Sequence, residues 1–259
     1  MPLGAHLREL RNRVVVVAVA VTVLSVVGWV FYDEVFAVLG RPLAVAAAEA
    51  GREDDVTLNI GSVVGVFDLK VRVSVFTGVL LASPVWLWQL WAFITPGLTR
   101  REKRYATAFV TASVPLFLGG VALAYTALPR AVTFLVELTP EGIVNLVDTS
   151  MYLGFVMRIL LAFGIAFLLP VVLVALNVIG VLQARSMLRA WRWVVVVSFA
   201  FAAVATPSPE VTAMFFLAVP MTLLFFVAIG ISALNDRRRA RRDREEGYGG
   251  LADEEVSPL

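Results

Sequence analysis

Two glutamates with strongly basic neighbours are the residues whose type and spacing could do chemistry in this 259-residue chain. Glu9 lies in the segment His6-Leu-Arg-Glu-Leu-Arg-Asn-Arg13, and Glu102 lies in Thr99-Arg-Arg-Glu-Lys-Arg104. Each carboxylate could accept the paired N–H groups of a guanidinium, at about 1.5–3 kcal/mol per charge-assisted hydrogen bond. The neighbouring arginines would keep both acids ionised and repel unmatched ligands. The alternative is a helix-surface ion pair, such as Glu9 with Arg13, worth a few tenths of a kcal/mol.

The remaining composition gives little support for catalysis. The chain has no cysteine and one histidine, His6, so neither a thiolate nor a histidine metal site is expected. No nucleophile–base pair or phosphate-binding loop is present, so we expect no enzyme activity and no cofactor. The net charge of +2 does not indicate a nucleic-acid partner. A protein that binds a cationic partner through these two glutamates is one possibility. An ion-coupled transporter and a purely structural membrane scaffold are the alternatives.

The elements that must position the two acids follow from hydropathy. The chain is 59% hydrophobic and 16% charged, with a mean hydropathy of +0.85, whereas soluble domains are about 45–50% apolar and 25% charged. Lipid must therefore be its main solvent. We predict an all-α membrane protein with six transmembrane helices, near residues 14–31, 73–94, 106–128, 155–182, 193–205 and 211–234. The fifth is too short to cross unaided, and a turn at 206–210 joins it to the sixth.

Prolines inside the apolar segments predict bent helices, because each removes a backbone hydrogen bond. They are Pro84, Pro115, Pro170 and Pro220. Ordinary membrane-helix prolines and a deliberately curved, concave bundle both fit this pattern. Small residues would let helices approach closely, and the candidates are Gly119, Gly120 and Gly164.

The distribution of basic residues predicts that both termini are cytoplasmic, because Lys and Arg flank the inner ends of membrane spans. All but six of the 22 basic residues lie on one side, the exceptions being Arg41, Arg52, Lys70, Arg72, Arg130 and Arg158. We expect a membrane domain over 1–234 and a disordered cytoplasmic tail over 235–259. Arg158, inside the fourth segment, either reaches up to the outer headgroups or pairs with Glu210 or Asp148.

A series of motifs, in order and with matching spacing over about residues 2–234, resembles the TatC family of the twin-arginine protein translocase. The motifs include His6-Leu-x-Glu-Leu-Arg-x-Arg13, the segment 83–104, Pro140-Glu-Gly142, Phe163-Gly164 and Ala218-Val-Pro220. The resemblance implies a multi-pass protein of a bacterial or archaeal cytoplasmic membrane. Such a protein binds the twin-arginine signal peptides of folded cargo. It works with the single-span partners TatA and TatB, in an oligomeric complex driven by the proton-motive force.

The resemblance also implies roles for individual residues. Glu9 and Glu102 match signal-peptide-binding carboxylates, in a patch also shaped by Arg11, Arg13, Phe93, Pro96 and Leu98. Contacts with a partner helix are implied for Leu168, Thr206, Glu210 and Met214, where Leu168 replaces a usual glutamate and Met214 a usual glutamine. Positions of structural or functional weight are Pro42 in an outer loop, Tyr125 in the third helix, and Pro170.

Overall fold

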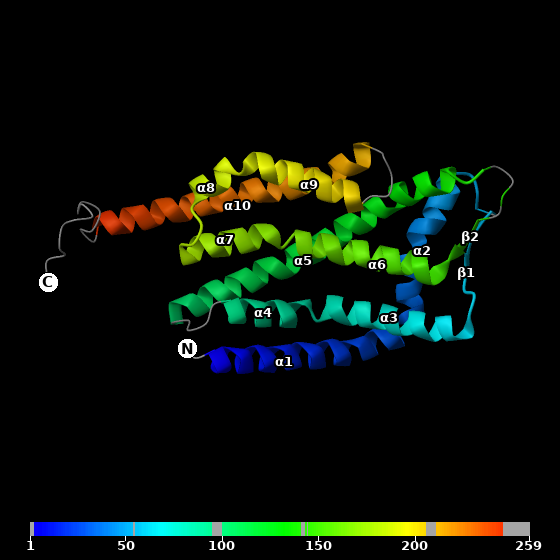
Figure 1. Cartoon of the computed structure of the whole chain (residues 1–259), viewed down its shortest axis with the longest axis horizontal. Coiled ribbons are helices and arrows are strands. Elements are labelled where there is room, and N and C mark those ends of the chain that lie inside the picture. The colour runs from blue at the N-terminus through cyan, green and yellow to red at the C-terminus, as the bar shows by residue number, and fades with distance from the viewer. Residues whose placement is uncertain are drawn as a thin grey trace.

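Most helices run along one long axis, and α2 (Tyr32–Glu49) runs across it at one end, in a computed structural model that describes residues 3–53, 55–94, 100–140, 143, 145–205 and 211–245. Figure 1 shows that one end of the molecule, here called the amino-terminal end, holds the first residues of α1 (Leu3–Val30), the end of α4 (Ser83–Ile94), the start of α5 (Arg100–Glu137) and helix α8 (Ala184–Arg189). Helix α2 and the two strands lie at the opposite end, here called the sheet end (Figure 1).

The chain order of the elements is simple, and their bounds are as follows. They are α1 Leu3–Val30, α2 Tyr32–Glu49, β1 Val56–Asn59, α3 Val63–Leu81, α4 Ser83–Ile94, α5 Arg100–Glu137, β2 Asn145–Asp148, α6 Thr149–Ala166, α7 Leu169–Ile179, α8 Ala184–Arg189, α9 Trp191–Ala205 and α10 Val211–Glu245. Among the described residues, four helical segments are long and apolar enough to cross a membrane: His6–Val30, Thr107–Glu137, Thr149–Ile179 and Met214–Arg241.

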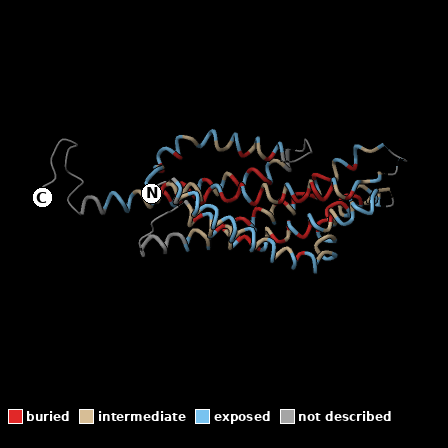
Figure 2. The backbone as a smooth tube through the Cα atoms, turned by 60° about the horizontal axis from the view of Figure 1, so that its bottom comes forward, coloured by how far each residue is buried: buried red, intermediate tan, exposed pale blue. Residues whose placement is uncertain are grey.

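Apolar side chains cover the outside of the bundle as well as its core, as expected for a protein dissolved in lipid. On α1, for example, Val15, Val19 and Val23 are exposed. The interior is built around large side chains with almost no exposure, such as Phe117 on α5 and Phe163 on α6. Figure 2 shows buried residues along the inner helices and exposed ones along the periphery.

Two of the expected spans are interrupted, and in both the proline begins a new helix rather than bending an old one. Helix α3 ends at Leu81 and α4 begins with Ser83-Pro84. Helix α6 ends at Ala166, and Pro170 stands in the first turn of α7. This position suits proline, because its missing N–H would have no partner there. Pro115 and Pro220, by contrast, lie inside continuous helices.

Several helices extend beyond the segments that hydropathy marks. Helix α3 begins ten residues before position 73, and its charged turns are compensated, since Arg72 pairs with Asp68 at 2.8 Å. The disorder expected from residue 235 is wrong for its first part, because α10 continues to Glu245. The Asp236 carboxylate helps to hold this extension, accepting hydrogen bonds from the buried Asn177 and from the backbone N–H of Ala184, each at 2.8 Å.

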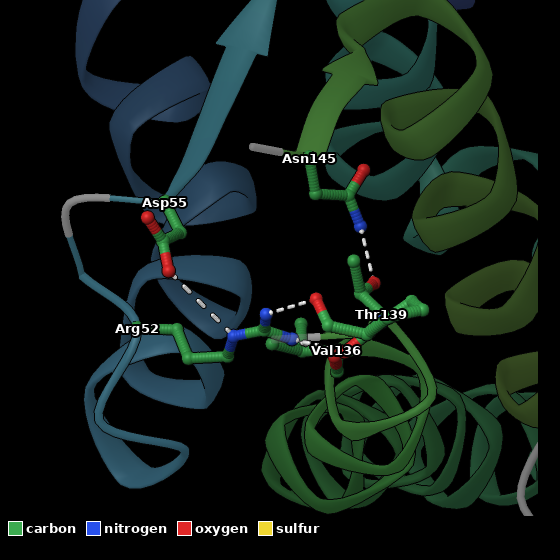
Figure 3. A network of polar contacts seen from close by, with 6 residues as sticks. Arg52, Asp55, Val136, Thr139 and Asn145 are labelled. Atoms are coloured by element: carbon green, nitrogen blue, oxygen red, sulfur yellow. Dashed lines mark hydrogen bonds and ion pairs between the residues drawn. The ribbon is translucent and has the colours of Figure 1, made fainter. Parts of the chain in front are cut away.

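The sheet end contains structure that the all-α prediction missed. Strands β1 and β2 pair in parallel, with Val56 opposite Asn145 and Asn59 opposite Asp148. Arg52 lies beside this sheet and donates hydrogen bonds to the carbonyl oxygens of Val136, Thr139 and Pro140 at the end of α5 (Figure 3). The loops before β1 and β2 are therefore tied to each other.

Several helices approach each other closely at glycine residues, which have no Cβ. A Cβ added to Gly28 would lie 2.7 Å from the Ser74 carbonyl oxygen, so α1 and α3 touch through their backbones. An added Cβ on Gly120 would lie 2.6 Å from the Phe163 carbonyl oxygen of α6, and one on Gly164 would meet the Phe117 ring. The expected close approach is confirmed for these two glycines. It is wrong for Gly119, which faces open space.

Candidate functional site

Glu9 lies in the second turn of α1 and is held by Arg13. The Arg13 Nε and Nη2 atoms donate to the same carboxylate oxygen, Oε1, at 3.0 and 2.6 Å. The third donor, Nη1, bonds the side-chain oxygen of Gln89 on α4 at 3.0 Å. The ion pair expected from the spacing of Glu9 and Arg13 is therefore present, and a residue from a second helix extends it.

The Glu9–Arg13–Gln89 group borders an open depression at the amino-terminal end. The depression has a volume of about 460 Å³ and is lined by Arg8, Glu9, Asn12, Arg13, Val16 and Gln89. Five of these six lining residues are polar or charged, and Gln89 stands within an otherwise largely apolar α4.

Packing between α1 and α4 holds this arrangement. The rings of His6 on α1 and Phe93 on α4 stack with centroids 4.6 Å apart. Further along α1, the Gly28 contact and a similar one at Gly78 hold α1 against α3, the helix that directly precedes α4. Phe93 therefore packs on the first turns of α1, but it is not among the residues that line the depression.

The electrostatics of Glu9 leave it able to accept another cation. Both Arg13 donors engage Oε1, and among the described residues none donates to Oε2. The side chains of Glu9 and Arg13 are 31% and 25% exposed, and ion pairs with this exposure contribute about 0–1 kcal/mol. A second guanidinium could therefore bind at Oε2 while Arg13 stays bound to Oε1 and to Gln89.

The other residues expected in the patch divide into two groups. Arg11 is exposed and bonds the Asn12 side chain at 3.3 Å, but it does not line the depression. Glu102 lies in the first turn of α5, which starts at the same end of the bundle (Figure 1), and its side chain falls outside the described part. Pro96 and Leu98 also lie outside the described residues.

Gln89 and Asn12 are site residues that the motif comparison did not supply. Gln89 is a polar residue within the very apolar α4, and a polar residue in such a helix indicates a specific hydrogen-bonding role. Its role depends on α1 packing against α4, which residue spacing within one segment does not reveal.

The residues expected to contact a partner helix lie at different depths in the bundle. Leu168 is only 7% exposed and packs in a cluster with Leu87 and Phe117. Met214, in the first turns of α10, is partly exposed. Thr206 and Glu210 lie outside the described residues.

Of the three positions expected to have structural or functional weight, Tyr125 joins two helices, and the two prolines are buried within the bundle. The Tyr125 hydroxyl of α5 donates to the Val38 carbonyl oxygen of α2 at 2.8 Å. Pro42 was expected in a loop, but it is buried inside α2. Pro170 is buried where α7 begins.

Arg158 is exposed on α6, and its Nε donates to the Gly154 carbonyl oxygen of its own helix at 3.0 Å. Asp148 does not pair with it, because its carboxylate accepts from the Met151 N–H and caps α6. The side chain points one turn towards the sheet end, as expected for an arginine that reaches for headgroups.

Comparison with known proteins agrees with the fold and the motifs. The family described as "Sec-independent protein translocase protein (TatC)" matches residues 5–220. The TatC protein of Xylanimonas cellulosilytica is 47% identical over 93% of this chain and 87% of its own length. That of Rothia mucilaginosa is 39% identical over 93% and 82%. A solved structure described as "Crystal Structure of Twin Arginine Translocase Receptor- TatC" has a TM-score of 0.69 and 31% identity, covering 89% of this chain and 99% of its own. The chain therefore belongs to the TatC family, whose members are multi-pass membrane proteins of protein transport rather than enzymes.

Proposed function

We propose that this chain is the receptor subunit of a twin-arginine translocase and that the patch around Glu9 binds the paired arginines of a signal peptide. The observation that carries this proposal is the Arg13–Glu9–Gln89 group beside an open polar depression. It displays a carboxylate that already accepts one guanidinium and retains an oxygen for another.

Recognition of two adjacent arginines needs two acceptors. A guanidinium offers a rigid fork of donors that matches a carboxylate, whereas a lysine ammonium is a point charge. Glu9 would accept the first arginine through Oε2, and Glu102, at the start of α5, the second. The surrounding cationic side chains would repel a lone positive charge, so only a ligand that satisfies both acids would bind well.

The membrane arrangement we propose has six crossings and a cytoplasmic amino-terminal end. The crossings are α1, α3–α4, α5, α6–α7, α9 and α10, curved by the breaks and prolines described above. Helix α9 has 15 residues and is about 22 Å long, short of the roughly 30 Å hydrocarbon core. The basic residues concentrated at the amino-terminal end support this orientation.

The partners we propose are the single-span proteins TatA and TatB, acting in an oligomeric complex that uses the proton-motive force. The partly exposed Met214 suits contact with a partner helix, and Thr206 and Glu210 precede it in the chain. Leu168 would take part only where a rearrangement uncovers it, because it is buried against Leu87 and Phe117.

The test is photocrosslinking of a twin-arginine signal peptide to the membrane-embedded chain. An Arg-Arg peptide should crosslink in a way that Glu9→Ala weakens and Glu9→Lys abolishes, because lysine adds repulsion to the lost attraction. Glu34→Ala removes an exposed acid from α2, at the sheet end, and serves as the matched control.

Replacing the peptide's Arg-Arg with Lys-Lys should reduce crosslinking to the level of the Glu9→Ala variant. Crosslinking that ignores this replacement, or that survives the loss of both Glu9 and Glu102, would reject the receptor function. It would favour a structural scaffold instead.

A further inference from the structure

Arg158 stands on a face of α6 that looks out of the bundle. Met151, Arg158 and Ile165 are exposed and are spaced seven residues apart, so they share one face of the helix. Of the Arg158 donors, only Nε is used within the described part of the chain, by the Gly154 carbonyl oxygen. The terminal nitrogens are left to bind something outside the bundle.

The same face leads into an apolar groove. Helices α6, α7, α9 and α10 enclose a space of about 360 Å³ whose lining includes Ala162, Ile165, Leu173, Val197 and Leu224. Ala162 and Ile165 follow Arg158 by four and seven residues, so the groove begins one turn beyond the arginine. Ile165 is 58% exposed, which means that the groove opens to the surroundings.

The dimensions match one leaflet of a bilayer. Ala162 and Leu173 are separated by eleven residues, or about 16 Å along the helix direction. One leaflet of a hydrocarbon core about 30 Å thick is about 15 Å deep. Arg158 lies nine residues from the start of α6 at the sheet end, and its side chain points back towards that end.

We propose that Arg158 and this groove form a binding site for one phospholipid of the leaflet at the sheet end. The terminal guanidinium nitrogens donate to the lipid phosphate, which they recognise in a forked geometry. One acyl chain lies in the groove past Ala162 and Ile165. The site would anchor a lipid between the α6–α7 break and the short helix α9.

The groove favours a lipid over a helix of a partner protein. An α-helix with its side chains is about 10–12 Å across, so a piece about 16 Å long occupies about 1,300 Å³, far more than the groove's volume of about 360 Å³. A flexible hydrocarbon chain can fill it. The arginine then neutralises the phosphate where both groups are close to interfacial water, which lowers the cost of exposing Arg158 on a membrane helix.

The test is native mass spectrometry of the purified full chain, titrated with dioleoylphosphatidylglycerol and with dioleoylglycerol, which has the same chains but no phosphate. Arg158→Gln should weaken binding of the phospholipid about tenfold, the loss of one charge-assisted hydrogen bond, and leave dioleoylglycerol unchanged. Arg158→Lys should give an intermediate affinity. Ile165→Trp, which narrows the groove, should weaken binding of both lipids.

Arg72→Gln is the matched control, because Arg72 also lies nine residues from the start of its helix but is paired with Asp68. Its affinity should stay within about twofold of wild type, as expected for an exposed ion pair. A phosphatidylglycerol with a diazirine in one acyl chain should label residues 162–173 and 194–201. Equal affinities of wild type and Arg158→Gln would overturn the proposal, as would labelling confined to other helices.

Discussion

Replacing Arg52 with alanine should detach the two loops at the sheet end from each other. Arg52 is the side chain that joins the residues before β1 to the end of α5, through three backbone carbonyl oxygens (Figure 3). Its side chain is only 12% exposed, so water replaces these bonds poorly. The contact with Asp55 is long, at 3.8 Å, and adds little.

The magnitude follows from the hydrogen bonds. The bonds to Thr139 and Pro140 are short, whereas the bond to Val136 is longer, at 3.2 Å. Two charge-assisted bonds at about 1.5 kcal/mol each give a loss of about 3 kcal/mol for Arg52→Ala. Arg52→Lys should recover part of this, because the ammonium cannot reach all three carbonyl oxygens at once.

Hydrogen exchange measured by mass spectrometry is the direct assay. The amide of Asn145, which donates to the Asp55 carbonyl oxygen at 2.8 Å, and the amides of the β1–β2 pair should lose protection by about 100-fold, which corresponds to 3 kcal/mol. Arg72→Ala removes an exposed pair and should change stability by less than about 1 kcal/mol. Unchanged protection of the β1–β2 amides in Arg52→Ala would refute the reasoning.

Three further substitutions test the packing. Gly78→Val should lower the free energy of unfolding in detergent by about 1–3 kcal/mol, because a Cβ there meets the backbone of α1. Gly119→Val is the control, and it should lower the free energy of unfolding much less, because Gly119 faces open space. Equal losses of stability in the two variants would argue against the close contact at Gly78. Asn177→Leu removes the hydrogen bond to the Asp236 carboxylate and should lower the free energy of unfolding by about 1–3 kcal/mol. The α10 extension should then be cleaved faster by a protease. Cleavage at the wild-type rate would show that other contacts hold the extension. Arg158→Leu should leave membrane insertion and helix content intact, and a collapse of either would contradict its exposed position.

Hydropathy located the apolar parts of the membrane helices, because lipid requires long apolar segments whatever the packing. It did not locate helix ends, since a helix continues into the polar region when its charges are paired, as with Arg72 and Asp68. The sequence of α2 does carry the spacing of an amphipathic helix. Its buried residues Leu39, Leu43, Ala46 and Ala47 share one face at helical spacing.

The prolines predicted irregularity but not its form. Pro84 and Pro170 begin new helices, and Pro115 and Pro220 remain inside old ones. The difference depends on which neighbours shield the freed carbonyl groups, and such neighbours come from distant parts of the chain. The same reason explains the strand pair at the sheet end, since β1 and β2 are brought together only by the surrounding helices.

The candidate site was predictable only within one helix. The spacing of Glu9 and Arg13 on α1 indicated their ion pair, which is present. Gln89 and the stacking of Phe93 on His6 come from α4 and depend on helix packing. Whether Glu9 and Glu102 act together remains a prediction of the motifs.

A double-mutant cycle between the receptor and its ligand tests that central idea most directly. Binding of fluorescent signal peptides with Arg-Arg, Arg-Lys, Lys-Arg or Lys-Lys pairs would be measured for wild type, Glu9→Gln, Glu102→Gln and the double variant. We predict that each glutamate variant weakens Arg-Arg binding by about tenfold or more, that each is coupled to a different arginine of the pair, and that Lys-Lys binding hardly changes. Equal losses for the Arg-Arg and Lys-Lys peptides, or no loss in the double variant, would contradict the account.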